Sequence, residues 1–148
     1  MGDNMKGQIM SHREFLVTER DVEAIEKRIG MLTGGMDEES WESVRRLHEE
    51  LSHARVLHDG EVPDDIVTMN TSVMLEDVET GRQRLCTLVY PGFIEGGADR
   101  VSVLSPMGTA LLGARVGDML EYEGATGPER ARIADIVYQP EAAGHSFL

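Results

Sequence analysis

The first half of the chain carries apolar residues at helical spacing. Between residues 18 and 32 they recur every three or four positions, which predicts an amphipathic helix with one buried face. These apolar residues are Val22, Ile25, Ile29 and Leu32. Thr18 precedes the run and Asp21 follows three residues later, an arrangement that resembles a capping box with Asp in place of Glu. A first helix is therefore expected to begin just after Thr18.

A second helix is predicted beyond residues 33–36, where two glycines interrupt the first one. We expect Asp37 or Ser40 to cap it and residues 59–60 to end it, ahead of Pro63. Its apolar positions are Trp41, Val44, Leu47, Leu51 and Ala54. Two short helices with one apolar stripe each predict an antiparallel hairpin. Because such a hairpin has little core of its own, we expect it to dock on the rest of the chain.

The second half of the chain changes to the period of β-strands. Five strands are expected, around residues 73–75, 85–89, 101–104, 119–123 and 133–138. Turns rich in glycine and proline separate them. Between the third and fourth strands, Ser105 and Pro106 begin a segment that ends in Gly113, which predicts a short helix with Ser105 as its N-cap. The fold class is therefore α+β, with one short helix on a twisted, mainly antiparallel sheet.

The domain organisation follows from these two patterns. Glycine, proline and acidic residues cluster near residues 59–65 and mark a boundary between the halves. We expect a flexible N-terminal tail over 1–17, an antiparallel helical hairpin forming a short coiled coil over 18–60, and a β domain over 65–148.

Charge and cysteine content narrow the possible partners. The formal net charge of −13 over 148 residues disfavours direct binding to nucleic acid but suits docking on a basic protein surface. Cys86 is the single cysteine, so no internal disulfide is expected, and its apolar neighbours favour a buried position. The N-terminal residues lack the apolar core of a signal peptide, and no apolar run is long enough to span a membrane. We expect a cytoplasmic protein.

No local motif indicates catalysis. His48, His53 and His58 are spaced five residues apart, whereas metal ligands on one helix face need three or four. The glycines form no phosphate-binding loop, and no base accompanies the lone cysteine. The chain is therefore expected to have no enzyme activity.

Carboxylates gather at the predicted tip of the hairpin, at Asp37, Glu38, Glu39 and Glu42. Carboxylates in a first helical turn complement the helix dipole, which explains them without any ligand. A projecting acidic tip could also coordinate Mg²⁺ or meet a basic partner. Mg²⁺ at the tip is the only cofactor that the residues suggest.

Five motifs carry a resemblance to a known family. They are VTMN at 67–70, TLVYP at 87–91, SPMGTALLG at 105–113, VGD at 116–118 and YQPEAAG at 138–144. In this order they resemble the regulator of nucleoside diphosphate kinase family, relatives of the Gre transcript-cleavage factors. The YQPEAAG run is specific to the regulator branch. The resemblance covers the chain from about residue 65 to its end.

The resemblance implies both a fold and a partner. The C-terminal half would have the FKBP-like fold of Gre factors and would dock on RNA polymerase near the rim of the secondary channel, with the hairpin pointing toward that channel. In Gre factors the Ser-Pro segment before the short helix lies at the polymerase contact. The matching residues here are Ser105, Pro106 and Met107, with Leu104 beside them. Gre proteins that dock strongly tend to have an acidic residue where Leu104 stands.

The hairpin departs from the Gre pattern. Gre cleavage factors place an Asp and a Glu three residues apart at the tip of a long coiled coil, where they help to hold a catalytic Mg²⁺. Here Ser40 stands three residues after Asp37, and Glu39 and Glu42 have the spacing without the Asp. The predicted hairpin is also shorter. We expect a protein that binds polymerase without stimulating cleavage and competes with Gre factors.

Two other functions stay open. The chain could be an acidic interaction module that acts on another partner, such as nucleoside diphosphate kinase. FKBP-like domains also include peptidyl-prolyl isomerases, whose pockets are lined with aromatic residues. The aromatic residues of the second half are few: Tyr90, Phe93, Tyr122, Tyr138 and Phe147.

Overall fold

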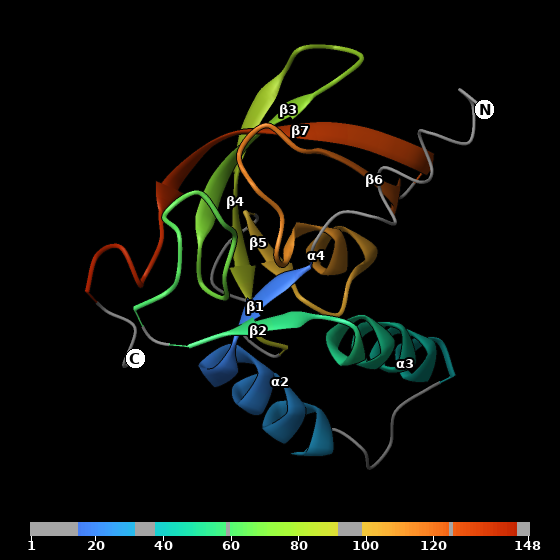
Figure 1. Ribbon diagram of the computed structural model, residues 1–148. Helices are drawn as coiled ribbons and strands as arrows, with labels where there is room; N and C mark the ends of the chain where they lie inside the picture. Colours follow the sequence, from blue (N-terminus) through green and yellow to red (C-terminus); the bar gives the residue numbers. More distant parts are fainter. Residues whose placement is uncertain (1–14, 32–37, 59, 92–98, 125, 145–148) are drawn as a thin grey trace, which may run out of the picture.

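The structure is a computed structural model that describes residues 15–31, 38–58, 60–91, 99–124 and 126–144. Its elements are β1 (Leu16–Thr18), α2 (Glu19–Met31), α3 (Glu38–Ser52), β2 (Arg55–Leu57), β3 (Ser72–Asp77), β4 (Gln83–Val89), β5 (Arg100–Ser102), α4 (Pro106–Leu111), β6 (Met119–Gly124) and β7 (Gly127–Tyr138). Figure 1 shows the larger sheet at the top, α4 beneath it, then the β1–β2 pair, and α2 and α3 at the bottom. The α+β class is confirmed.

The larger sheet has five strands in the order β5-β4-β3-β7-β6, and all five lie where strands were expected. The expectation of an antiparallel sheet is wrong at one edge, because β4 and β5 pair in parallel. Residues 90–99, rather than a tight turn, connect these two strands.

One face of this sheet is apolar and packs on α4. Val73 and Leu75 of β3 and Leu88 of β4 are buried on it together with Ile133 of β7. Leu111 of α4 is fully buried in the same cluster. The strands therefore alternate between an inner face that contacts α4 and an outer face turned to solvent.

A second, two-stranded sheet pairs the segment before α2 with the segment after α3. β1 pairs in parallel with β2, with Val17 opposite Val56. This pairing was not expected, since three-residue strands are too short to show a period. It also explains why α3 ends at Ser52 rather than near residue 59, as the chain turns there to enter β2. β1 lies so close to Gly113 that a Cβ on that residue would come within 2.7 Å of the Leu16 carbonyl oxygen.

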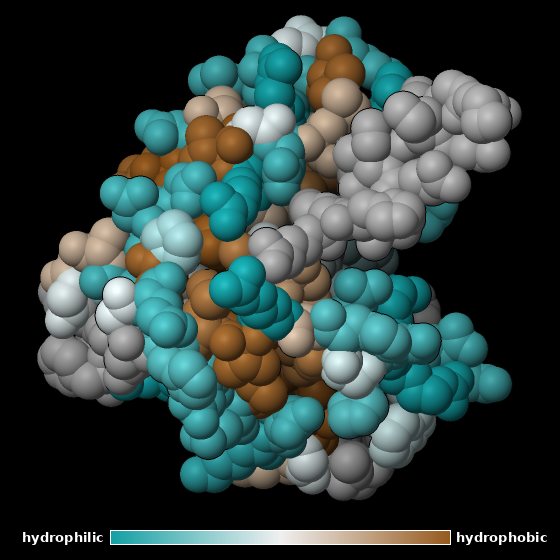
Figure 2. Space-filling model, viewed as in Figure 1, coloured by the Kyte–Doolittle hydropathy of each residue, from teal (hydrophilic) through white to brown (hydrophobic). Residues whose placement is uncertain are grey.

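The helical hairpin docks on this framework, as expected. Ile25 of α2 and Leu47 and Leu51 of α3 are buried in the same core cluster as the inner face of the sheet. Figure 2 shows apolar side chains gathered between the helices and the sheet, with polar side chains over the outer surface of the helices. The helices have 13 and 15 residues, so they do not form a long coiled coil. None of the helices in the described ranges has the length and apolarity of a membrane span.

Candidate functional site

The start of α4 holds the four residues that the resemblance assigns to a polymerase contact. Ser105 is the N-cap, as predicted: its Oγ accepts a hydrogen bond from the Gly108 N–H at 3.0 Å. The Ser105 hydroxyl donates to the Ser102 carbonyl oxygen at 2.7 Å, which ties the cap to the end of β5. Pro106 occupies the first helical turn and is exposed. Since the Ser105 hydroxyl is used inside the fold, a partner would meet the Pro106 ring first.

A close approach between α4 and β5 holds this surface in place. A Cβ on Gly108 would lie 1.9 Å from the Ser102 carbonyl oxygen, so only glycine permits the contact. One residue further on, the Thr109 hydroxyl donates to the Val103 carbonyl oxygen at 2.8 Å. The start of α4 is therefore positioned by backbone contacts as well as by its cap.

Leu104 and Met107 flank Pro106 and are both half-buried against the core cluster. The Leu104 N–H donates to the Ser102 hydroxyl at 3.1 Å. A guanidinium nitrogen of Arg84, on β4, lies 3.5 Å from the Met107 sulfur. The four predicted residues are consecutive in the chain, and the structure places Arg84, which is distant in sequence, beside the last of them. In the sequence, Arg84 could have been recognised as a basic residue at an inward-facing position of a predicted strand.

The structure describes only part of the predicted acidic tip. Glu38 and Glu42 are exposed on the first turns of α3, and Glu42 forms an ion pair with Arg45 at 3.4 Å. Asp37 and the side chain of Glu39 lie outside the described residues. Within the described residues, no group of three His, Cys, Asp or Glu side chains is arranged to hold a metal ion. A metal or partner contact at the tip stays a prediction.

A buried carboxylate joins the hairpin to the β domain. Thr18 caps α2 as predicted, since its Oγ1 accepts from the Asp21 N–H at 2.9 Å. The Asp21 carboxylate, however, turns into the β domain, where it accepts from the Met69 N–H at 3.0 Å and the Tyr90 hydroxyl at 3.4 Å. Burial raises the pKa of Asp21 to about 6. The Arg28 guanidinium covers the Tyr90 ring at 4.8 Å from its centroid, so α2 contacts the β domain at two points.

The YQPEAAG motif makes a second contact, next to the one that Asp21 makes. The Gln139 side-chain amide donates to the carbonyl oxygens of Pro63 and Ile66, at 2.8 Å each. The next charged residue, Glu141, accepts from the Thr68 hydroxyl at 2.7 Å. Its charge adds to the rise in the pKa of Asp21. The motif therefore orders the segment that precedes β3, the same segment that binds Asp21.

Comparison with known proteins identifies the class. Residues 62–138 match the family described as "Transcription elongation factor, GreA/GreB, C-term", and the chain belongs to the GreA/GreB family. Over 103 residues it is 40% identical to the "Regulator of nucleoside diphosphate kinase" of Escherichia coli (strain K12), which covers 69% of this chain and 76% of that relative. The chain is a homologue of that regulator within the family, and the recognised resemblance is confirmed.

Two further relatives support the assignment. "Transcription elongation factor GreA" of Thermotoga petrophila is 28% identical over 94 residues, covering 64% of this chain and 60% of that protein. A solved structure titled "Prokaryotic transcription elongation factor GreA/GreB from Nitrosomonas europaea" superposes with a TM-score of 0.70 at 29% identity. That superposition covers 84% of this chain and all of the other. The Gre-like fold therefore extends to the helices that precede the β domain.

Proposed function

We propose that this chain is an RNA polymerase-binding transcription regulator that docks near the secondary channel and competes there with Gre factors. The observation that carries the proposal is the match to the Gre C-terminal family over residues 62–138. That range includes α4, whose first turn exposes Pro106 between two half-buried apolar side chains. The surface is small, rigid and apolar.

The geometry suits a docking contact. Pro106 has a restricted backbone, and the cap at Ser105 and the glycine contact at Gly108 hold it against β5. A preorganised surface loses little conformational entropy when a partner binds. The Ser105 hydroxyl is already hydrogen-bonded inside the fold, so the contact buries no unpaired polar group there.

The length and the tip of the hairpin support binding to polymerase without stimulation of transcript cleavage. At ~1.5 Å per residue, α2 spans about 20 Å and α3 about 22 Å. With Ser40 three residues after Asp37, the tip lacks the Asp and Glu pair of cleavage factors. The chain would occupy the entrance of the channel and exclude other ligands, and it would have no enzyme activity of its own. Its net charge of −13 favours a basic protein surface over nucleic acid and fits a cytoplasmic regulator.

Stalled elongation complexes test this proposal. Added alone, the chain is expected to leave the rate of transcript cleavage unchanged. Added with a Gre factor, it should suppress cleavage in proportion to its concentration, and Leu104→Arg should suppress less. A clear rise in cleavage by the chain alone, lost in the Asp37→Ala, Glu39→Ala double variant, would refute the non-cleaving assignment.

A second candidate partner comes from the name of the 40%-identical relative, which is called a regulator of nucleoside diphosphate kinase. The exposed apolar surface on α4 could meet such a kinase directly. A pull-down from cell extract separates the two partners, because polymerase subunits and the kinase differ in size. Recovery of the kinase without polymerase would favour this second candidate.

A further inference from the structure

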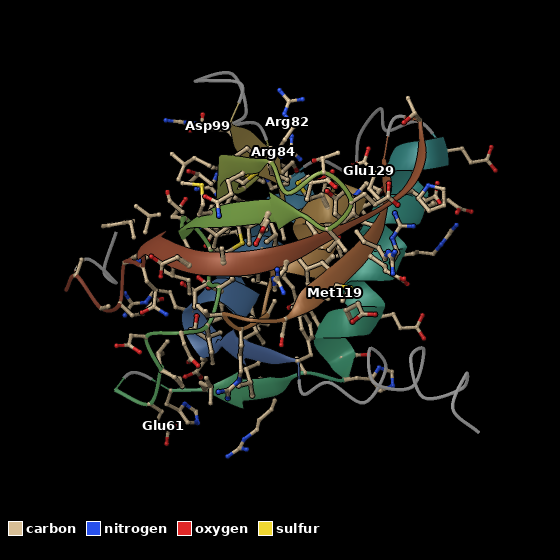
Figure 3. The ribbon with its side chains drawn as sticks, turned by 90° about the horizontal axis from the view of Figure 1, so that it is seen from above. Glu61, Arg82, Arg84, Asp99, Met119 and Glu129 are labelled. Atoms are coloured by element: carbon tan, nitrogen blue, oxygen red, sulfur yellow. The ribbon has the colours of Figure 1, made fainter. Side chains whose placement is uncertain are left out.

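The inner face of the sheet extends beyond α4 and forms a cavity of about 380 Å³ there. Leu75 and Ala131 supply its apolar lining, and Tyr122 and Glu129 line it from the β6–β7 hairpin. Arg82 and Arg84 line it from the β3–β4 hairpin. Figure 3 shows these two arginines close together on one side of the sheet, with Glu129 near the start of β7.

The strand register explains how these side chains meet. Leu75 is opposite Arg84, and Tyr122 is opposite Glu129. Directly paired residues point to the same face of a sheet, and Leu75 is buried on the inner one. Gly124 makes room for the Glu129 side chain, since a Cβ there would lie 2.3 Å from a Glu129 carboxylate oxygen. Most of the lining therefore comes from strands, and Thr80 and Arg82 are added by the turn between β3 and β4.

The carboxylates of the cavity already have partners. Asp77 Oδ1 accepts from the backbone N–H groups of Glu79 and Thr80, at 2.8 and 3.0 Å. These bonds hold the pKa of Asp77 below its usual range. Glu129 lies beside the Tyr122 hydroxyl, where burial and then the Glu129 charge raise the pKa of that hydroxyl. Neither carboxylate therefore needs a cation from a partner.

Both arginines of the cavity are exposed, and Arg84 acts on the Asp77 carboxylate only through its charge, which helps to lower the pKa of Asp77. Among the described residues, no carboxylate lies within the 4.0 Å ion-pair distance of Arg82 or Arg84. Arg84 interacts with the Tyr122 hydroxyl and with the Met107 sulfur, which is a weak acceptor. Each guanidinium has five N–H donors. In a chain with 27 acidic and 14 basic residues, two neighbouring arginines that form no ion pair among the described residues leave guanidinium donors that suit an anionic group from outside.

We propose that this cavity receives an acidic side chain of the protein partner that docks on α4. The carboxylate would accept hydrogen bonds from Arg82 and Arg84, since a guanidinium binds a carboxylate in a planar, two-bond geometry. The methylene groups of the acidic side chain would contact Leu75 and the Tyr122 ring. Because Arg84 touches Met107, the cavity continues the surface around Pro106. The inference rests on the proposed function and adds an acidic anchor to a partner surface that is otherwise expected to be basic.

Charge-reversal variants test the cavity in polymerase binding. The measurement is the affinity of the full-length, fluorescently labelled chain for core RNA polymerase. Arg82→Glu and Arg84→Glu are expected to weaken binding by about tenfold or more, because like charges would then face each other. The matched control is Arg115→Glu, on the loop after α4, where Arg115 is exposed and pairs with Asp65 at 3.6 Å. The control should stay within about twofold of the wild type, and all three variants should melt near the wild-type temperature.

A probe without polymerase separates this inference from the proposed function. Blocked Leu-Glu-Leu and Leu-Gln-Leu peptides, and inorganic phosphate, are titrated into the isotope-labelled full-length chain and followed by NMR. Only the glutamate peptide should shift the signals of Arg84 and Tyr122. Equal shifts with both peptides, or equal shifts with phosphate, would overturn the acidic-side-chain assignment. So would wild-type affinity of Arg82→Glu and Arg84→Glu for polymerase, which would leave the proposed function standing. If the wild type does not bind polymerase, the proposed function fails. The peptide titration is then the remaining test of whether the cavity binds an acidic side chain.

Discussion

The Asp21 carboxylate accepts a hydrogen bond from the Met69 backbone N–H at 3.0 Å and thereby ties the first helix to the strand-bearing half of the chain. Asp21 is only 5% exposed, and the residues that contact it belong to three separate segments of the sequence. A carboxylate in this position fixes the angle of the hairpin more narrowly than apolar packing would, because hydrogen bonds are directional. Under the proposed function the angle matters, since it would decide where the hairpin points when a partner binds α4.

The buried carboxylate predicts a pH-dependent stability. The pKa of Asp21 is about 6 in the folded protein against 3.8 for the unperturbed group, chiefly because of burial. An acid with a raised folded pKa binds its proton more tightly when folded. Its stabilising contribution is therefore complete below 3.8 and is lost as the pH rises through about 6. From about pH 4.5 to about pH 7.5 this should lower the free energy of unfolding by about 2 kcal/mol.

Asp21→Asn provides the control for that prediction. Asparagine keeps an oxygen that can accept from Met69 but does not titrate. Urea unfolding of both proteins should show the wild type losing about 2 kcal/mol relative to Asp21→Asn between about pH 4.5 and about pH 7.5, because only the wild type loses stability through Asp21. Curves that stay parallel would show that Asp21 does not titrate in this range.

Replacing Gln139 is expected to lower the stability of the protein strongly, because its side-chain amide forms buried hydrogen bonds. The side chain is buried at 3% exposure and donates to the Pro63 and Ile66 carbonyl oxygens. Gln139→Ala removes both bonds and leaves buried acceptors unpaired, which should lower the free energy of unfolding by about 2–4 kcal/mol. Gln83→Ala, at an exposed glutamine on β4, should change it by less than about 0.5 kcal/mol. Chemical denaturation compares the two, and equal effects would contradict the role of Gln139.

Gly108→Ala is expected to displace α4 from its position against β5. The added Cβ would lie 1.9 Å from the Ser102 carbonyl oxygen, and backbone on both sides has to move to relieve it. We expect a loss of about 1–3 kcal/mol in stability, as for other overpacked core sites, together with weaker polymerase binding. Gly30→Ala on α2 has open space around its Cβ and should be neutral or stabilising by up to about 1 kcal/mol. Thermal melting distinguishes them, and an unchanged melting temperature in Gly108→Ala would contradict the close contact.

Much of the fold could be predicted because its signals are local. The cap at Thr18, the cap at Ser105 and the alternation along β3 and β4 each depend on residues a few positions apart. The buried position expected for Cys86 is also confirmed. By contrast, β1 and β2 have three residues each and show no period, so only their pairing defines them. The parallel pairing of β5 has no local signal either.

The residues that surround the predicted contact could be predicted less completely, because they are distant in sequence. The Ser-Pro motif marks the start of α4 within one stretch of sequence, so the structure finds Leu104, Pro106 and Met107 together. Arg84 lies 23 positions before Met107, and the Asp21 carboxylate binds a residue 48 positions away. Contacts of that separation follow from strand register and domain docking, which no local pattern encodes.

The most direct test of the central claim is the affinity of the full-length chain for core RNA polymerase, measured for the wild type, Pro106→Ala and Leu104→Arg, with a Gre factor as competitor. The account predicts binding at about micromolar affinity or tighter, weakened by both substitutions and displaced by the Gre factor. Wild-type affinity in both variants, or no binding by the wild-type chain, would contradict it.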